Sequence, residues 1–70
     1  MKSVKIYGKE SCPYTSRARQ AFAKDGYAVD YIDVRADSSK IPEMLALSGG
    51  RRAVPVIVDE GKVTIGYGGT

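Results

Sequence analysis

The stretch VKIYGKESCPYT, residues 4–15, decides the fold of this 70-residue chain. Residues 4–7 alternate apolar and polar side chains, which predicts a short strand. Residues 8–11 predict a loop. Pro13 suits the first position of a helix, because the N–H group that proline lacks would be unpaired there. Cys12 is therefore expected between the end of a strand and the start of a helix.

The next elements along the chain complete a strand, helix, strand unit. The first helix is predicted to run from Pro13 to the pair at 25–26, Asp-Gly, which is typical of a helix end. Its apolar stripe has helical spacing and is formed by Tyr14, Ala18, Ala21 and Phe22. Residues 27–34 alternate again and predict a second strand. This order implies a parallel crossover connection.

The second half of the chain predicts one more helix and a hairpin. The helix is expected between N-cap residues at 37–39 and a glycine pair at 49–50. Its expected apolar stripe is formed by Ile41, Met44, Leu45 and Leu47. The apolar run 54–58 and residues 62–65 predict the two strands of a hairpin. The fold class that follows is α/β, a single domain over residues 1–70 with the order β-α-β-α-β-β and a mixed four-stranded sheet.

Composition narrows the classes of function. The chain has one cysteine and no histidine, so it has no internal disulfide and no ordinary zinc site, and no metal is expected. The net charge of +3 is mild and the basic residues form no long run, so nucleic acid is not an expected partner. No signal peptide and no membrane span are recognised, so we expect no membrane contact and a cytoplasmic, reducing compartment.

The expected position of Cys12 at the start of a helix affects the ionisation of its thiol. The unpaired N–H groups and the positive end of the helix dipole favour an anion there, so the thiol pKa should fall. Lys9 adds a positive charge nearby, whereas Glu10 opposes it if the carboxylate points the same way. The residues alone leave two readings open, a reactive thiolate or a buried small apolar side chain.

Pro55 is the second unusual feature, because proline cannot donate a hydrogen bond to a sheet. One explanation is a cis Val54–Pro55 peptide that exposes the backbone of Val54 to an extended ligand. The other is a trans proline that starts an edge strand. The sequence does not decide between them.

Four segments, in this order and spacing, resemble the glutaredoxins, which have a thioredoxin-like fold. The segments are residues 6–14, 49–52, 53–56 and 63–66. The resemblance covers nearly the whole chain and implies a thioredoxin-like, glutaredoxin-like sheet. The family usually has a further C-terminal helix, and this helix is expected to be absent here. We expect a monomer or a weak homodimer.

The resemblance implies glutathione chemistry, with glutathione as co-substrate and Cys12 as the nucleophile that accepts it as a mixed disulfide. Many glutaredoxins carry a second cysteine three places later, where this chain has Thr15. Only a monothiol route is therefore open. Thr15 either donates a hydrogen bond to the thiolate or merely serves the first helical turn.

The resemblance also assigns a set of glutathione-binding residues. They are Lys9, Tyr14, Arg52, Val54, Pro55, Gly66 and Gly68. Lys9 would contact a carboxylate, Tyr14 would line the groove, and the Val54 backbone would pair with the tripeptide. Arg52, or its neighbour Arg51, either helps in the groove or is a solvated loop charge. The family's acidic residue for the γ-glutamyl end has no counterpart in residues 66–70.

Three functions follow as expectations. The first is thiol-disulfide oxidoreduction on glutathione mixed disulfides or small disulfides, which makes the chain an enzyme. The second is a carrier of a 2Fe–2S cluster, as a glutathione-bridged dimer. The third is a redox-inactive binding module that keeps the glutaredoxin fold.

Overall fold

The structure, a computed structural model, describes residues 2–67. The elements along the chain are β1 (Ser3–Gly8), α1 (Pro13–Lys24), β2 (Ala28–Asp33), a short 3₁₀ helix (Ser38–Lys40), α2 (Ile41–Ser48), β3 (Val56–Asp59) and β4 (Lys62–Ile65). The predicted α/β class and the order of helices and strands are confirmed. In this described part of the chain, no helix is long and apolar enough to cross a membrane.

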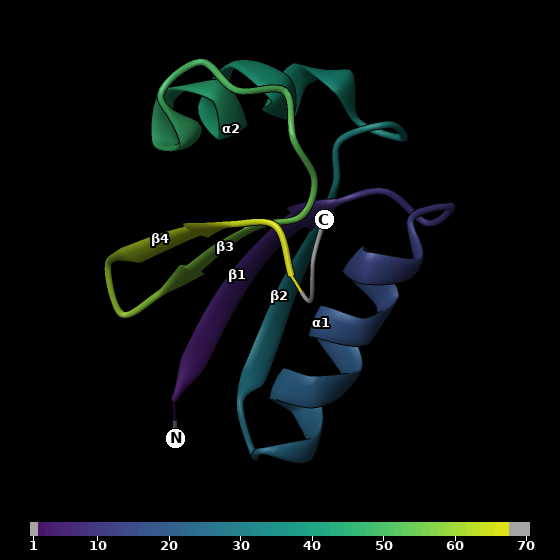
Figure 1. The fold of residues 1–70 in the computed structure, drawn as a ribbon, viewed down its shortest axis with the longest axis vertical. Coiled ribbons are helices and arrows are strands. Elements are labelled where there is room, and N and C mark those ends of the chain that lie inside the picture. The colour runs from purple at the N-terminus through teal and green to yellow at the C-terminus, as the bar shows by residue number, and fades with distance from the viewer. Residues whose placement is uncertain (1, 68–70) are drawn as a thin grey trace.

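The four strands form one mixed sheet with the order β2-β1-β3-β4. β1 pairs in parallel with β2 and antiparallel with β3, and β4 completes the antiparallel hairpin. Figure 1 shows α1 on one face of this sheet and α2 on the other. The third strand starts at Val56, two residues later than the sequence predicted, because Pro55 has no N–H group for the ladder.

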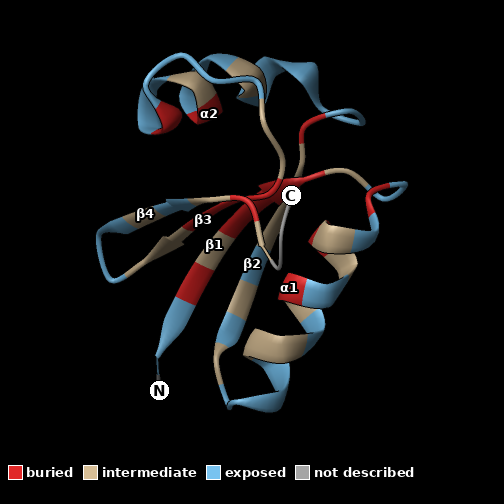
Figure 2. Ribbon diagram, in the orientation of Figure 1, coloured by how far each residue is buried: buried red, intermediate tan, exposed pale blue. Residues whose placement is uncertain are grey.

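The core has two layers, one on each face of the sheet. Alternation along β1 sends Val4 and Ile6 toward α1, where they pack with Ala18 and Ile57. The buried residues on the α2 face are Tyr7, Val34, Met44 and Val56. Figure 2 shows this buried set concentrated on β1 and the start of β3. The end of β1, from which the Cys12 loop leaves, is therefore the most firmly packed part of the sheet.

The second helix buries the predicted face at Ile41, Met44 and Leu45 but not at Leu47. Met44 and Ser48 are buried, whereas Leu47 is 36% exposed, so its expected place in the apolar stripe is wrong. At 3.6 residues per turn, positions 41, 44, 45 and 48 share a face and position 47 lies well to one side of it. The Ser48 hydroxyl donates to the carbonyl oxygen of Arg51 at 2.7 Å, which ties the following loop to the helix.

Candidate active site

Cys12 is the N-cap residue of α1, with Pro13 directly after it at the first helical position. Its N–H donates to the carbonyl oxygen of Lys9 at 3.1 Å, and its own carbonyl accepts from the N–H of Ser16 at 3.2 Å. The first turn of the helix contains no acidic residue. The positive end of the helix dipole thus faces the thiol without a neighbouring carboxylate in that turn.

The thiol of Cys12 is buried, with 8% of the residue exposed, and nevertheless its pKa is lowered. Burial acts to raise the pKa. It is outweighed by the donors at the start of α1, namely the Thr15 hydroxyl and the N–H groups of Thr15 and Tyr14, and by the positive charge of Lys9. The site therefore favours the thiolate, which is the form that attacks disulfides.

Thr15 lies beneath the thiol with 1% of its surface exposed. Among residues 2–67, its buried Oγ1 has no hydrogen-bond partner in bonding geometry. A donor without another acceptor is available to the thiolate, which explains how this hydroxyl lowers the Cys12 pKa. Thr15 also packs directly on Gly8, where an added Cβ would lie 2.6 Å from Oγ1. Gly8 therefore lets the helix approach the strand closely.

Glu10, the residue that was expected to oppose Lys9, is engaged elsewhere. Its carboxylate lies 3.6 Å from the guanidinium of Arg19 in the second turn of α1. That guanidinium in turn stacks 3.9 Å from the ring centre of Tyr31. The positive charge of Lys9 is left to act on the thiol.

A cavity of about 300 Å³ lies between the Cys12 loop, the loop after β2, α2 and the segment before β3. Its lining residues are Lys9, Val34, Arg35, Ile41, Met44, Arg52 and Val54. Three residues that the resemblance assigned to glutathione, namely Lys9, Arg52 and Val54, meet here although they are up to 45 positions apart. Arg51 is exposed and is not part of this lining.

The segment before β3 is shaped by its proline. The Val54–Pro55 peptide bond is cis. Gly66, with a φ of 87°, donates its N–H to the carbonyl oxygen of Pro55 at 2.7 Å. Gly66 therefore lies against this segment, in a conformation that favours glycine. Gly68 lies outside the described residues.

For Tyr14, a place in the groove beside the sulfur stays a prediction. Its half-buried ring lies 5.6 Å from the guanidinium carbon of Arg17 and is not part of the cavity lining. The backbone N–H of Tyr14 is one of the groups that lower the pKa of the Cys12 thiol.

Arg35 is the charged lining residue that sequence reasoning missed. Its position after a strand end, directly behind Asp33 and Val34, was the available signal. It carried no motif, and only the fold brings this loop next to the Cys12 loop, where the Arg35 guanidinium donates to the Ser11 hydroxyl at 3.5 Å.

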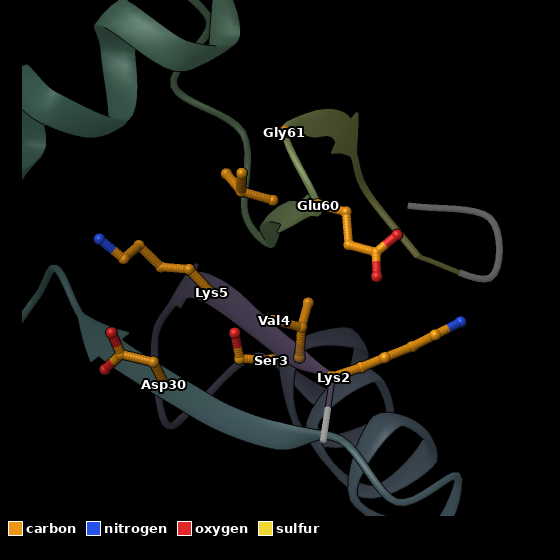
Figure 3. A pocket seen from close by; sticks show the side chains of 8 residues that line it. Lys2, Ser3, Val4, Lys5, Asp30, Glu60 and Gly61 are labelled. Atoms are coloured by element: carbon orange, nitrogen blue, oxygen red, sulfur yellow. The ribbon is translucent and has the colours of Figure 1, made fainter.

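A larger hollow, of about 680 Å³, lies at the opposite end of β1 from Cys12 (Figure 3). Its charged side chains are of both signs, Lys2 and Lys5 with Asp30 and Glu60. It contains no thiol and none of the predicted site residues. The smaller cavity, whose lining includes Lys9 of the Cys12 loop, is therefore the better candidate for a ligand site.

Comparison with known proteins decides the family. The Glutaredoxin family model matches residues 4–64, most of the chain. The chain belongs to the glutaredoxin family. This match covers the Cys12 loop, the cavity and the hairpin.

Individual glutaredoxins agree with the assignment. Glutaredoxin 3 of Escherichia coli K12 is 37% identical over 57 residues, which are 81% of this chain and 68% of that protein. Glutaredoxin-C8 of Oryza sativa is 38% identical over 64 residues, 84% of this chain and 46% of that protein. The glutaredoxin structure from Archaeoglobus fulgidus superposes with a TM-score of 0.79 at 26% identity, over 97% of this chain and 78% of that one.

A ligand complex is among the structural relatives. The buckwheat glutaredoxin–glutathione complex superposes with a TM-score of 0.75 at 27% identity, over 93% of this chain and 61% of that one. The thioredoxin-like fold predicted from the sequence is thereby confirmed.

Proposed function

We propose that the protein is a glutathione-dependent thiol-disulfide oxidoreductase that works by a monothiol route through Cys12. The observation that carries the proposal is the lowered pKa of this thiol at the start of α1, in a loop whose Lys9 lines a cavity together with two further cationic residues. Membership of the glutaredoxin family and the glutathione complex of the buckwheat relative support glutathione as the co-substrate. The same chemistry suits a reducing, cytoplasmic compartment.

The reaction proceeds in two exchanges at one sulfur. The Cys12 thiolate attacks the glutathione sulfur of a substrate–glutathione disulfide. A Cys12–glutathione disulfide forms, and the substrate sulfur leaves as a thiolate. This thiolate then takes a proton from water. A second glutathione thiolate attacks the bound glutathione sulfur, so glutathione disulfide leaves and the Cys12 thiolate is restored. Over the cycle the substrate sulfur is reduced from disulfide to thiol, and the sulfur of the one incoming glutathione is oxidised from thiol to disulfide. The glutathione sulfur that arrived with the substrate stays in a disulfide throughout.

The cavity supplies the binding that this reaction needs. Lys9 and Arg52 offer positive charge to the carboxylates of the tripeptide. Val54 offers backbone groups to an extended peptide, as an added strand would use them. The apolar wall formed by Ile41 and Met44 covers the carbon chain of the ligand.

The test measures the ionisation of Cys12 and its reaction with glutathione disulfide. The alkylation rate of Cys12 against pH gives the thiol pKa, and intact mass after incubation with glutathione disulfide counts adducts. For wild type we expect a thiol pKa below that of a free thiol and a single reversible glutathione adduct. Cys12→Ser should show no alkylation, no adduct and no turnover. Turnover in Cys12→Ser refutes the proposal. So does wild-type protein with an ordinary thiol pKa and no adduct, which is the behaviour of a binding module.

The cluster-carrier alternative has its own readout. The wild-type protein is incubated anaerobically with iron, sulfide and glutathione. A stable visible chromophore on a dimer, with no exchange activity in the apo form, would replace the proposed function with cluster transfer.

A further inference from the structure

Arg35 is held at the cavity by a fixed loop. The Asp33 carboxylate accepts hydrogen bonds from the N–H groups of Arg35 at 2.9 Å and of Ala36 at 3.0 Å. The N–H of Val34 donates to the carbonyl oxygen of Gly8 at 3.0 Å, which fastens this loop to the end of β1. The backbone of Arg35 is therefore fixed on both sides, and its side chain extends to Ser11, the neighbour of Cys12.

The charge around the cavity is of one sign. Three of its seven lining residues are cations, Lys9, Arg35 and Arg52, and none is acidic. Among residues 2–67, the one ion pair within 4.0 Å joins Arg19 to Glu10, so no paired carboxylate neutralises these three cations. Two of them come from segments that flank Cys12 and Pro55. Arg35 adds a third from the loop after β2.

We propose that Arg35 is a specificity-determining residue, which selects the small thiol partner by its carboxylates. The inference rests on the proposed exchange function and names the chemistry of its preferred partner, a thiol carrying two carboxylates. Three cations in one cavity of about 300 Å³ attract the two carboxylates of such a thiol more strongly than they attract a thiol of the same size without carboxylates. Guanidinium groups suit carboxylates, because their N–H donors match both oxygens.

Arg35 is expected to affect the binding of the substrate and not the pKa of the Cys12 thiol. The groups that shift the Cys12 pKa are burial, Thr15, Tyr14 and Lys9, and Arg35 is not one of them. Its removal should therefore raise KM and leave kcat and the thiol pKa unchanged. This separates a specificity role from a general effect on the Cys12 loop.

The test compares two mixed disulfides of one peptide, with glutathione and with glutathione diethyl ester, on four proteins. The proteins are wild type, Arg35→Gln, Arg35→Lys and Lys40→Gln, where Lys40 is an exposed cation outside the cavity that controls for the loss of one charge. We expect Arg35→Gln to raise KM for the glutathione disulfide by up to about fivefold, the upper end of the range for an exposed ion pair. Arg35→Lys should recover part of this loss, and the diester should show no change.

A second control separates Arg35 from its hydrogen bond to the active-site loop. Ser11→Ala removes the acceptor of the Arg35 side chain and leaves its charge. If Ser11→Ala reproduces the KM of Arg35→Gln, the residue holds the loop and the inference is wrong. It is also wrong if Arg35→Gln matches Lys40→Gln or changes both disulfides equally. If wild type shows no exchange with either disulfide, the proposed function itself fails.

Discussion

Replacing Thr15 by valine tests how the site ionises Cys12. The side chain is 1% exposed, and valine keeps its branched shape while a methyl group takes the place of the hydroxyl. That hydroxyl has no partner among residues 2–67 and acts on Cys12 as the largest of the groups that lower its pKa. Thr15→Val should therefore raise the pKa of Cys12.

The magnitude follows from the energy of one hydrogen bond to a charged group, about 1.5 kcal/mol or more. Because about 1.4 kcal/mol is a factor of ten in an equilibrium, the thiolate fraction below the pKa should fall roughly tenfold. Alkylation near neutral pH should slow by about the same factor. In the thiol form the hydroxyl is buried without a partner, so its removal should stabilise the fold by about 1 kcal/mol.

Thr15→Val has two opposite effects on the free energy of unfolding, and which one is larger depends on pH. A lowered folded pKa contributes stability that is present above the unfolded thiol pKa, about 8.5, and is lost as pH falls through the folded pKa. Thr15→Val loses part of this contribution. The variant should be more stable than wild type at pH 5, and the difference should shrink or reverse at pH 9.5.

The assay combines alkylation rate against pH with urea unfolding at those two pH values. Thr15→Ser, which keeps the hydroxyl, is the matched control and should retain the low pKa. An unchanged Cys12 pKa in Thr15→Val, or a difference in unfolding free energy that does not depend on pH, refutes this account of the site.

Three further predictions concern neighbouring groups. Gly8→Ala should destabilise the fold by about 1–3 kcal/mol in urea unfolding, because the new Cβ would lie 2.6 Å from Thr15 Oγ1. Adding Thr15→Ala to the Gly8→Ala variant should restore part of the lost stability. Lys9→Gln should raise the Cys12 pKa and the KM for glutathione disulfides, with thermal stability nearly unchanged. Burial and Glu43 raise the pKa of Tyr7 to about 12. The stability that this group contributes below its unfolded pKa of about 10 should therefore be lost as the pH rises toward 12. Unfolding curves of Tyr7→Phe should show a weaker dependence of stability on pH in this range.

The elements that the sequence predicted correctly are those whose pattern is local. Alternation over residues 4–7 marks a strand, and Pro13 and the Asp-Gly pair at 25–26 mark the ends of a helix. The errors lie where tertiary packing decides. Leu47 was assigned to a buried face, although only the position of α2 over β3 and β4 determines which side of this short helix is covered.

The candidate site was predictable where a family pattern marked the residues. Lys9, Arg52 and Val54 were named from such a pattern, and they meet at one cavity. Arg35 had no pattern, since its relevance arises from the parallel pairing of β1 and β2, which brings the loops after both strands to the same edge of the sheet. The effect of the Tyr14 backbone N–H on the Cys12 pKa was not predicted, because side-chain identity says little about which backbone groups a helix start presents.

The sequence left Cys12 with two competing descriptions, a buried apolar side chain or a reactive thiolate, and in the structure the thiol is both buried and lowered in pKa. Burial excludes water and by itself raises the thiol pKa. The same exclusion strengthens each hydrogen bond that reaches the sulfur. The sign of the shift is therefore set by the number of donors at the start of α1, and not by the exposed area of Cys12. A strand–loop–helix with Pro13 at the first helical position leaves the next two N–H groups free to point at that sulfur, and Thr15 adds a third donor from the first turn.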